Sequence, residues 1–239
     1  MVNIAITGAN GRMGQAIARV ATSIAHISVV AQVSRDNTFE NIAISNNIDS
    51  IETVIDFTMP EPSLKYIDYC VQHKRSMVIG TTGFTQSQKE YILHASQNIP
   101  IVFAANMSTG VTVLSKAIRL IARTLPNNTE VNIIDAHHRH KKDAPSGTAL
   151  QMGQVVAEAR GQELGEDKAI CFHSIRAGEI IGEHTVLFTL PDEQIELKET
   201  VYSREAFARG ALQAALWVSK QPPGLYDMED VLSLKTTHL

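Results

Sequence analysis

Short apolar runs and amphipathic stretches alternate along the first 107 residues of the chain. Continuous apolar runs rich in β-branched residues predict buried strands at 2–7, 27–33, 54–57, 77–80 and 101–104. Apolar positions at helical spacing predict helices between them, at residues 16–24, 62–73 and 86–97. Strands that alternate with helices in this way favour an α/β fold of the Rossmann-like type, with a doubly wound parallel sheet.

The pattern changes after residue 107. A long amphipathic helix is predicted at residues 111–125, a strand at 130–136 and a helix at 148–160. Three later runs, at 169–175, 184–190 and 194–202, predict antiparallel strands. We expect a smaller α+β domain whose mixed or antiparallel sheet carries helices on one face and leaves the other face for a partner subunit.

A helix at residues 204–219 and a short cap at 224–234 complete the chain. A tail of this length has no core of its own, so we expect it to pack on the first domain. The sequence therefore predicts one domain at residues 1–107, completed by residues 205–239, and a second domain at residues 108–204.

Composition and charge narrow the functional classes. At 239 residues, with 44% hydrophobic and 19% charged residues, the chain is typical of a soluble globular protein. Its net charge of -4 argues against a general nucleic-acid binder. No apolar run approaches the roughly 20 residues that cross a bilayer, and the start lacks a signal-peptide pattern, so we expect no membrane partner. Two cysteines make no disulfide framework, so we expect a reducing, cytoplasmic environment.

Glycines at positions 8, 11 and 14 fill the connection between the first strand and the first helix. The spacing is G-x-x-G-x-x-G, with Asn10 at the place of the second glycine in the commoner dinucleotide-binding pattern. Asparagine tolerates left-handed backbone geometry, so the turn stays feasible. Such a turn lets a pyrophosphate approach the backbone and the helix N-terminus, and Gly14 allows the helix to pack closely on the strand. A tight turn without a ligand is the structural alternative.

The end of the second strand bears on the choice of cofactor. An acidic residue at this place would bind the 2′-hydroxyl of NAD, but the chain has Ser34 followed by Arg35. A small side chain and a cation suit a 2′-phosphate, so we expect NADPH, with NADH as a second cofactor. Asp36 is the opposing observation, because it can pair with Arg35 or bind the ribose itself.

The carboxyl ends of the other strands supply further candidates, since ligands of doubly wound sheets bind there. Small, polar or flat residues, which suit a nicotinamide ring, stand at 56–58, 80–83 and 104–107. Cys70 falls in the apolar stripe of a predicted helix, and we expect it to be a core residue rather than a nucleophile.

Residues 137–148, HHRHKKDAPSGT, concentrate candidate chemistry in the second domain. Ser146, Gly147 and Thr148 open a predicted helix, whose unpaired N–H groups and partial positive charge can hold a carboxylate or phosphate. Lys141 or Arg139 is placed to close over that anion. A histidine, with an unperturbed pKa of about 6.5, supplies a proton near neutral pH. The stretch therefore predicts an anion site beside a proton donor.

Three alternatives exist for this stretch. Neighbouring strand residues point to opposite faces and the cations at 139, 141 and 142 repel a divalent ion, so we expect no metal. A nucleic-acid patch would need interleaved aromatic residues, which are missing. A solvated charged loop explains the lysines but not the clustered histidines.

The same residues resemble the signature of the 4-hydroxy-tetrahydrodipicolinate reductase family, formerly called dihydrodipicolinate reductases, of bacterial lysine and diaminopimelate biosynthesis. The signature covers 136–141 (AHHRHK) and 143–149 (DAPSGTA). Segments 8–14, 56–58, 78–84, 104–106 and 182–184 are also similar to that family, in order and over nearly the whole chain. The family often has glutamate at the place of Ser34, and its members commonly carry longer loops than those at 36–51 and 161–177 here.

The resemblance implies a role for each group of residues. His137 would be the proton donor or acceptor, and Lys141 a second proton donor or charge stabiliser. His138, Gly147 and Thr148, together with the turn residue Ser146, would bind the substrate carboxylates. Members are typically homotetramers associated through the sheets of the second domain. NADPH or NADH would be held by Gly8, Ala9, Asn10, Gly11, Arg12, Met13, Ser34, Arg35, Gly80, Thr81, Thr82, Ala104, Ala105, Asn106 and Met107.

The sequence thus predicts an NAD(P)H-dependent reductase of a small dicarboxylate, 4-hydroxy-tetrahydrodipicolinate. The first domain would bind the dinucleotide, the second would bind substrate and form the oligomer, and closure of one on the other would be a step of turnover. Two other classes stay open. One is a dehydrogenase that acts through a thiol at Cys70 or Cys171, and the other is a nucleotide-sensing regulator without chemistry.

Overall fold

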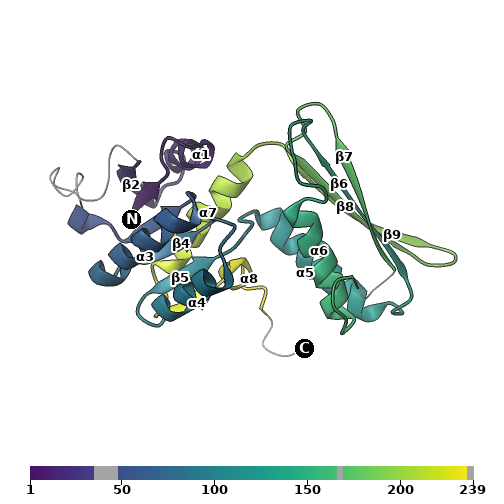
Figure 1. Ribbon diagram of the computed structural model, residues 1–239. Helices are drawn as coiled ribbons and strands as arrows, with labels where there is room; N and C mark the ends of the chain where they lie inside the picture. Colours follow the sequence, from purple (N-terminus) through teal and green to yellow (C-terminus); the bar gives the residue numbers. More distant parts are fainter. Residues whose placement is uncertain (35–47, 166–168, 236–239) are drawn as a thin grey trace. The chain divides into compact units, whose positions relative to one another are not determined.

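The computed structural model describes residues 1–34, 48–165 and 169–235, and the chain forms two compact units (Figure 1). The first unit combines Met1–Thr109 with Arg204–Leu239, and the second consists of Gly110–Ser203. Arg35, one of the predicted cofactor residues, lies outside the described residues.

Six parallel strands form the sheet of the first unit, in the order β10-β5-β4-β3-β1-β2. Because β1 pairs with β2 on one side and with β3 on the other, the winding of the sheet reverses at β1. The doubly wound parallel sheet predicted from the sequence is confirmed. Its elements are β1 (Val2–Thr7), α1 (Arg12–Ala21), β2 (Ile27–Val33), η1 (Ile48–Ser50), β3 (Thr53–Asp56), α3 (Pro60–His73), β4 (Ser76–Ile79), α4 (Gln86–Ala95), β5 (Pro100–Phe103) and β10 (Gly224–Tyr226).

Alternate side chains of β1 enter different core layers. Ile4 and Ile6 belong to the layer formed with α1 and α7 (Glu205–Val218), whereas Ala5 belongs to the layer formed with α3 and α4. A strand that is buried on both faces does not alternate between apolar and polar residues. This explains why the strands of this sheet have continuous apolar sequences. Cys70 is fully buried in the second layer, and burial raises the pKa of its thiol, in agreement with the predicted core role.

The C-terminal segment forms more than the cap predicted at residues 224–234. Its strand β10 pairs in parallel with β5 at the edge of the sheet, and α8 (Met228–Val231) follows. A strand of three residues is too short to show a period, so the hydrophobic pattern missed it.

A mixed sheet in the order β7-β6-β8-β9 forms the second unit. Its strands are β6 (Glu130–His137), β7 (Ile170–Arg176), β8 (Gly182–Thr189) and β9 (Gln194–Val201). β8 and β9 are antiparallel as predicted, but β7 runs parallel to β6, so the antiparallel prediction for 169–175 is wrong. The chain passes from β6 to β7 through α6 (Gly147–Ala159), and a helical crossover returns the next strand in the same direction.

Helices α5 (Thr109–Thr124) and α6 pack on one face of this sheet (Figure 1). Val131 of β6 and both Val186 and Phe188 of β8 are buried beneath them, while Thr185 and Leu187 on the other face stay partly exposed. β8 therefore alternates between a buried face and a partly exposed face, as expected for a sheet that carries helices on one face only. In the ranges that the structure describes, no helix is long and apolar enough to cross a membrane.

Gly210 in α7 supports a test of the close packing in the first unit. An added Cβ would lie 1.7 Å from the carbonyl oxygen of Met107. We expect Gly210→Ala to lower the free energy of unfolding by about 2 kcal/mol, because overpacking forces the backbone to shift. Denaturant unfolding measures this value. Gly147→Ala is the control, since a Cβ there meets nothing within 4 Å, and equal losses in both variants would contradict the packing argument.

Candidate active site

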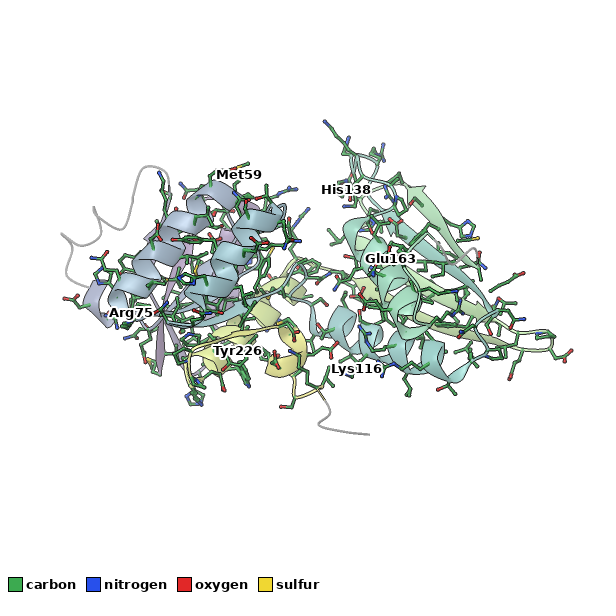
Figure 2. All side chains as sticks on the ribbon, turned by 60° about the horizontal axis from the view of Figure 1, so that its bottom comes forward. Met59, Arg75, Lys116, His138, Glu163 and Tyr226 are labelled. Atoms are coloured by element: carbon green, nitrogen blue, oxygen red, sulfur yellow. The ribbon has the colours of Figure 1, made fainter. Side chains whose placement is uncertain are left out.

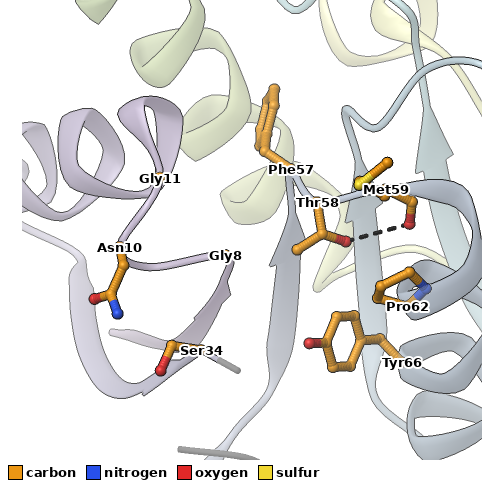
Figure 3. A pocket seen from close by; sticks show the side chains of 9 residues that line it. All are labelled: Gly8, Asn10, Gly11, Ser34, Phe57, Thr58, Met59, Pro62 and Tyr66. Carbon is orange, nitrogen blue, oxygen red and sulfur yellow. Dashed lines mark hydrogen bonds between the residues drawn. The ribbon is translucent and has the colours of Figure 1, made fainter. Parts of the chain in front are cut away.

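The turn between β1 and α1 forms one wall of a cavity of about 270 Å³ (Figure 3). Gly8 has a φ of +66°, in the left-handed region, and a Cβ there would lie 2.9 Å from Cγ2 of Thr58. A Cβ on Gly14 would lie 2.3 Å from the carbonyl oxygen of Gly8. Bare backbone is therefore required at both positions. The turn leads directly into α1, whose N-cap residue is Gly11.

The opposite wall comes from the start of α3 and the residues before it. Met59, Pro62 and Tyr66 line the cavity there, and Figure 3 shows the Tyr66 hydroxyl pointing toward the side where Ser34 lies. These three residues were not predicted from the sequence. The available signal was the start of α3 immediately after β3, marked by Pro60, because proline favours the first turn of a helix.

Asp56, at the end of β3, ties three strand ends together. Its buried carboxylate accepts hydrogen bonds from the hydroxyls of Thr7 at 2.5 Å, Thr58 at 2.7 Å and Thr81 at 2.6 Å, and from Ser63. The Thr81 oxygen in turn accepts the main-chain N–H of Thr58 at 2.9 Å. A buried carboxylate is stable only when donors surround it, so this network fixes the ends of β1, β3 and β4 relative to one another.

The other predicted cofactor residues follow the glycine turn or the carboxyl ends of parallel strands. Gly80 faces the Phe57 ring so closely that a Cβ would lie 2.2 Å from it. Met107 is buried in the core layer of α7, so this structure does not expose it to a ligand. Among the rest, Ala9 is buried, Met13, Ala104 and Asn106 are partly buried, and Arg12, Thr82 and Ala105 are exposed.

In the second unit, β6 carries the candidate acid at its carboxyl end. Alternate residues of a strand share a face, so Asp135 and His137 continue the row that Val131 and Ile133 begin in the core. The Oδ2 atom of Asp135 lies 3.0 Å from Nδ1 of His137. With Nδ1 engaged in this way, Nε2 is the nitrogen that His137 offers for proton transfer.

Several donors converge on the fully buried Asp135 carboxylate. The Ser174 hydroxyl donates to Oδ1 at 2.6 Å, and Nη1 of Arg176 donates to Oδ2 at 2.8 Å. The main-chain N–H of Ser146 donates as well. Burial acts to raise the pKa of Asp135, but the bonds from Ser174 and Arg176 outweigh it and hold that pKa below its usual value. Asp135 is therefore ionised at neutral pH.

Burial lowers the pKa of His137 below its usual value, and electrostatic interactions with His184 and Lys141 lower it further. The hydrogen bond and the charge of Asp135 oppose this shift without cancelling it. The imidazole is consequently mostly neutral at pH 7 in the free protein. A bound dianion would raise the pKa and favour the protonated form.

Strand β8 forms the other border of the acid. A Cβ on Gly182 would lie 3.3 Å from Nε2 of His137, so the glycine leaves that nitrogen uncovered. The His184 ring lies edge-on to the His137 ring with centroids 5.2 Å apart. Nδ1 of His184 faces Oε2 of Glu199 at 3.4 Å, and its Nε2 faces Oγ of Ser146 at 3.5 Å. The sheet register places these side chains next to one another on neighbouring strands, because Asp135 pairs with His184 and His184 pairs with Glu199.

The loop after β6 brings the predicted anion-binding residues together. Ser146 is the N-cap of α6, and its Oγ accepts the N–H of Ala149 at 3.2 Å. Nζ of Lys141 lies 2.9 Å from Oδ2 of Asp143, and the Gly147 N–H also donates to that carboxylate. The hydrogen bond from Lys141 lowers the pKa of Asp143. In this structure a carboxylate of the chain itself thus sits on the donors predicted for a carboxylate ligand.

Two further predicted substrate residues, His138 and Thr148, are partly exposed in this region, and Figure 2 labels His138 on the loop. Four residues around His137 were not predicted from the sequence: Asp135, Ser174, Arg176 and Glu199. Only Asp135 had a local signal, its place two residues before His137 on a strand. The others come from strands far away in the sequence. Among the described residues, no group of three or more histidine, cysteine or carboxylate side chains is arranged to hold a metal ion.

The comparisons with known proteins cover both units. The family models described as "Dihydrodipicolinate reductase, N-terminus" and "Dihydrodipicolinate reductase, C-terminus" match residues 2–107 and 110–232. The 4-hydroxy-tetrahydrodipicolinate reductase of Hahella chejuensis (strain KCTC 2396) is 42% identical over 267 residues, which cover 98% of this chain and 100% of that protein.

Solved structures agree with these matches. The dipicolinate-bound dihydrodipicolinate reductase from Paenisporosarcina sp. TG-14 has a TM-score of 0.80 at 25% identity, over 95% of this chain and 97% of that one. A probable dehydrogenase from Thermotoga maritima shares the fold, with a TM-score of 0.64 at 8% identity, over 96% of this chain and 92% of that one. With both units matched by models of one family, the chain belongs to the dihydrodipicolinate reductases.

Proposed function

We propose that the protein reduces 4-hydroxy-tetrahydrodipicolinate to tetrahydrodipicolinate with NAD(P)H, a step of lysine and diaminopimelate biosynthesis. The observation that carries this proposal is the buried Asp135–His137 pair beside Lys141 and the N-terminus of α6. The substrate carries two carboxylates, and the solved relative from Paenisporosarcina holds dipicolinate, itself a dicarboxylate.

His137 is the proton donor of this proposal. Its Nε2 protonates the 4-hydroxyl as the C–O bond breaks and water leaves, while a hydride adds to the ring. The Asp135 carboxylate orients the ring through Nδ1 and stabilises the protonated form, as a carboxylate does beside a catalytic histidine. The lowered pKa of His137 suits this role. A bound dianion raises that pKa, so His137 takes up its proton when substrate is present.

Lys141, His138, Ser146, Gly147 and Thr148 are proposed to hold the carboxylates. The support comes from Asp143, whose carboxylate already lies against the Lys141 ammonium and the Gly147 N–H. A substrate carboxylate that replaces the Asp143 carboxylate would bind the same ammonium and the same N–H group. Binding on preorganised donors also stabilises negative charge that develops during the reaction.

Residues of the first unit fit a dinucleotide. The bare backbone of Gly8 and Gly11, the N-terminus of α1 and the cavity of about 270 Å³ match the needs of a pyrophosphate and an adenosine. When bound, the reduced nicotinamide supplies the hydride. Gly80, Thr82 and the segment 104–106 are the proposed neighbours of that ring, because they follow β4 and β5 at the carboxyl edge of the sheet.

NADPH is the proposed preferred form. Ser34 lines the cavity and offers a hydroxyl instead of the carboxylate that would repel a 2′-phosphate. Arg35, the cation next to it in sequence, was predicted to pair with that phosphate.

A homotetramer is the proposed assembly. The sheet face opposite α5 and α6 carries partly exposed apolar side chains on three neighbouring strands, which a second copy can cover: Ile134, Ile175 and Leu187. Ile175 is the most exposed of the three, at 50%. Sheets packed face to face in this way bury apolar surface without further strands.

The thiol-dependent alternative has less support. The Cys70 thiol is fully buried with a raised pKa, and Cys171 pairs with Asn132 on the sheet face opposite Asp135. Neither sulfur lies beside the candidate acid, so neither is placed to attack a substrate held there.

His137→Ala tests the acid. We expect kcat with the dicarboxylate and NADPH to fall by about a hundredfold or more, because general acid catalysis contributes about that much. NADPH binding, measured by fluorescence titration, should change by less than threefold. His26→Ala, at an exposed position in the first unit, is the control. Turnover within a few-fold of wild type would overturn the assignment, and absent turnover in wild type would favour the regulator.

Asp135→Asn tests the environment of His137. The carboxylate raises the pKa of His137 by charge and hydrogen bonding, so its removal should lower that pKa further. The protonated acid is then lost at lower pH, and the alkaline limb of kcat/KM moves to lower pH. NMR titration of the imidazole measures the shift, with Asp192→Asn in an exposed turn as control. An unchanged or raised pKa would contradict the pairing.

Ser34→Glu tests the cofactor preference. The new carboxylate would repel a 2′-phosphate and accept bonds from a 2′-hydroxyl, so kcat/KM for NADPH should fall relative to NADH by about tenfold or more. Initial rates from the absorbance of both cofactors give the ratio. A ratio in wild type that already favours NADH would exclude the NADPH preference.

A further inference from the structure

We propose that Arg176 is a positioning residue that couples the acid His137 to the anion-binding loop 139–146, so that proton transfer and carboxylate binding depend on one guanidinium. The inference rests on the proposed function. Arg176 has no part in the chemistry itself, and it acts through Asp135 and through the main chain of the loop.

One arm of the guanidinium reaches the acid. Nη1 of Arg176 lies 2.8 Å from Oδ2 of Asp135, the same oxygen that faces Nδ1 of His137 at 3.0 Å. The parallel register explains this, because His137 pairs with Arg176 and Asp135 pairs with Ser174. Arg176 and His137 therefore share one carboxylate oxygen, and the position of that oxygen determines the orientation of the imidazole.

The other arm reaches the loop. Nη2 of Arg176 donates to the main-chain carbonyl of Asp143 at 2.6 Å. The side chain of the same residue pairs with Lys141, and the loop is tied again at Ser146, whose N–H donates to Asp135. A rigid planar fork that bonds two groups at once fixes the distance between them. The Arg176 side chain is 17% exposed, so these bonds are largely shielded from water.

The charge of Arg176 bears on His137 through the Asp135 carboxylate that the two side chains share. The groups around the imidazole are Asp135 on its own strand, Lys141 on the loop, Arg176 on β7 and His184 on β8, with Glu199 of β9 behind His184. Arg176 neutralises part of the Asp135 charge. Removing the cation leaves that carboxylate to interact with His137 more strongly, so the pKa of His137 should rise.

Two substitutions separate the effect of the Arg176 charge from the effect of its two-armed geometry. Arg176→Met removes both bonds and the charge, whereas Arg176→Lys keeps the charge but cannot form a two-armed fork. Arg119→Met is the matched control, because Arg119 pairs with Glu158 on the helices of the same unit, away from the acid. Circular dichroism and thermal unfolding identify the variants that fold.

Three readouts apply to each folded variant: the NMR titration of His137, the affinity for dipicolinate by calorimetry, and the steady-state kcat and KM. For Arg176→Met we expect the His137 pKa to rise, dipicolinate affinity to fall about tenfold, and kcat/KM to fall by about ten- to a hundredfold, as displaced catalytic groups do. For Arg176→Lys we expect a nearly unchanged pKa with affinity still reduced. Arg119→Met should match wild type in all three.

The proposal is overturned if Arg176→Met folds with an unchanged His137 pKa and unchanged dipicolinate affinity, because a residue that only supports the sheet would lower the unfolding temperature alone. If Arg176→Met does not fold, Arg176→Lys decides, and wild-type affinity in that variant overturns the coupling. Failure of the proposed function is distinguishable, because wild type would then show no turnover of the dicarboxylate. Failure of the acid assignment is distinguishable as well, because His137→Ala would then retain turnover whatever the Arg176 variants do.

Discussion

The Asp135 carboxylate is removed from water and surrounded by a hydroxyl, a guanidinium, an imidazole and a main-chain N–H. Burying an ion costs several kcal/mol unless such partners are in place. A shift of one residue in the pairing of β6 would turn Asp135 to the opposite face and leave the charge unpaired. The register of the sheet, the rotamer of His137 and the path of the loop 139–146 therefore all depend on the need to satisfy this one carboxylate.

The first unit contains a second buried carboxylate, and the two differ in their partners. The donors that the structure describes at Asp56 are the hydroxyls of threonines and a serine, which satisfy the oxygens without a fixed charge. Asp135 instead shares its charge between Arg176 and His137. The first arrangement holds backbone in place around a cavity. The second arrangement also raises the pKa of His137 relative to burial alone, which suits the proton donor proposed above.

Much of this arrangement followed from the sequence, because its signals are local. The parallel sheet could be predicted from apolar runs, and the turn at Gly8 and the cap at Ser146 from residue type and spacing. The direction of β7 could not, since periodicity carries no information on pairing. Arg176 and Glu199 could not be predicted for the same reason. They are placed beside His137 and His184 by the pairing of strands that lie far apart in the chain. Tyr66 was hidden because the pattern of α3 indicated a buried face but not the cavity beside it.

The order of the elements along the chain has a consequence for synthesis. The polypeptide leaves the first unit at Thr109 and returns to it at Arg204. Until the last segment emerges from the ribosome, the β1 face that α7 covers stays exposed and the edge of β5 has no partner. The second unit is continuous and has all its strands before that moment. The inserted unit is therefore synthesised in full before the helix and the strand that complete the first unit, although the first unit holds the strands that are made earliest.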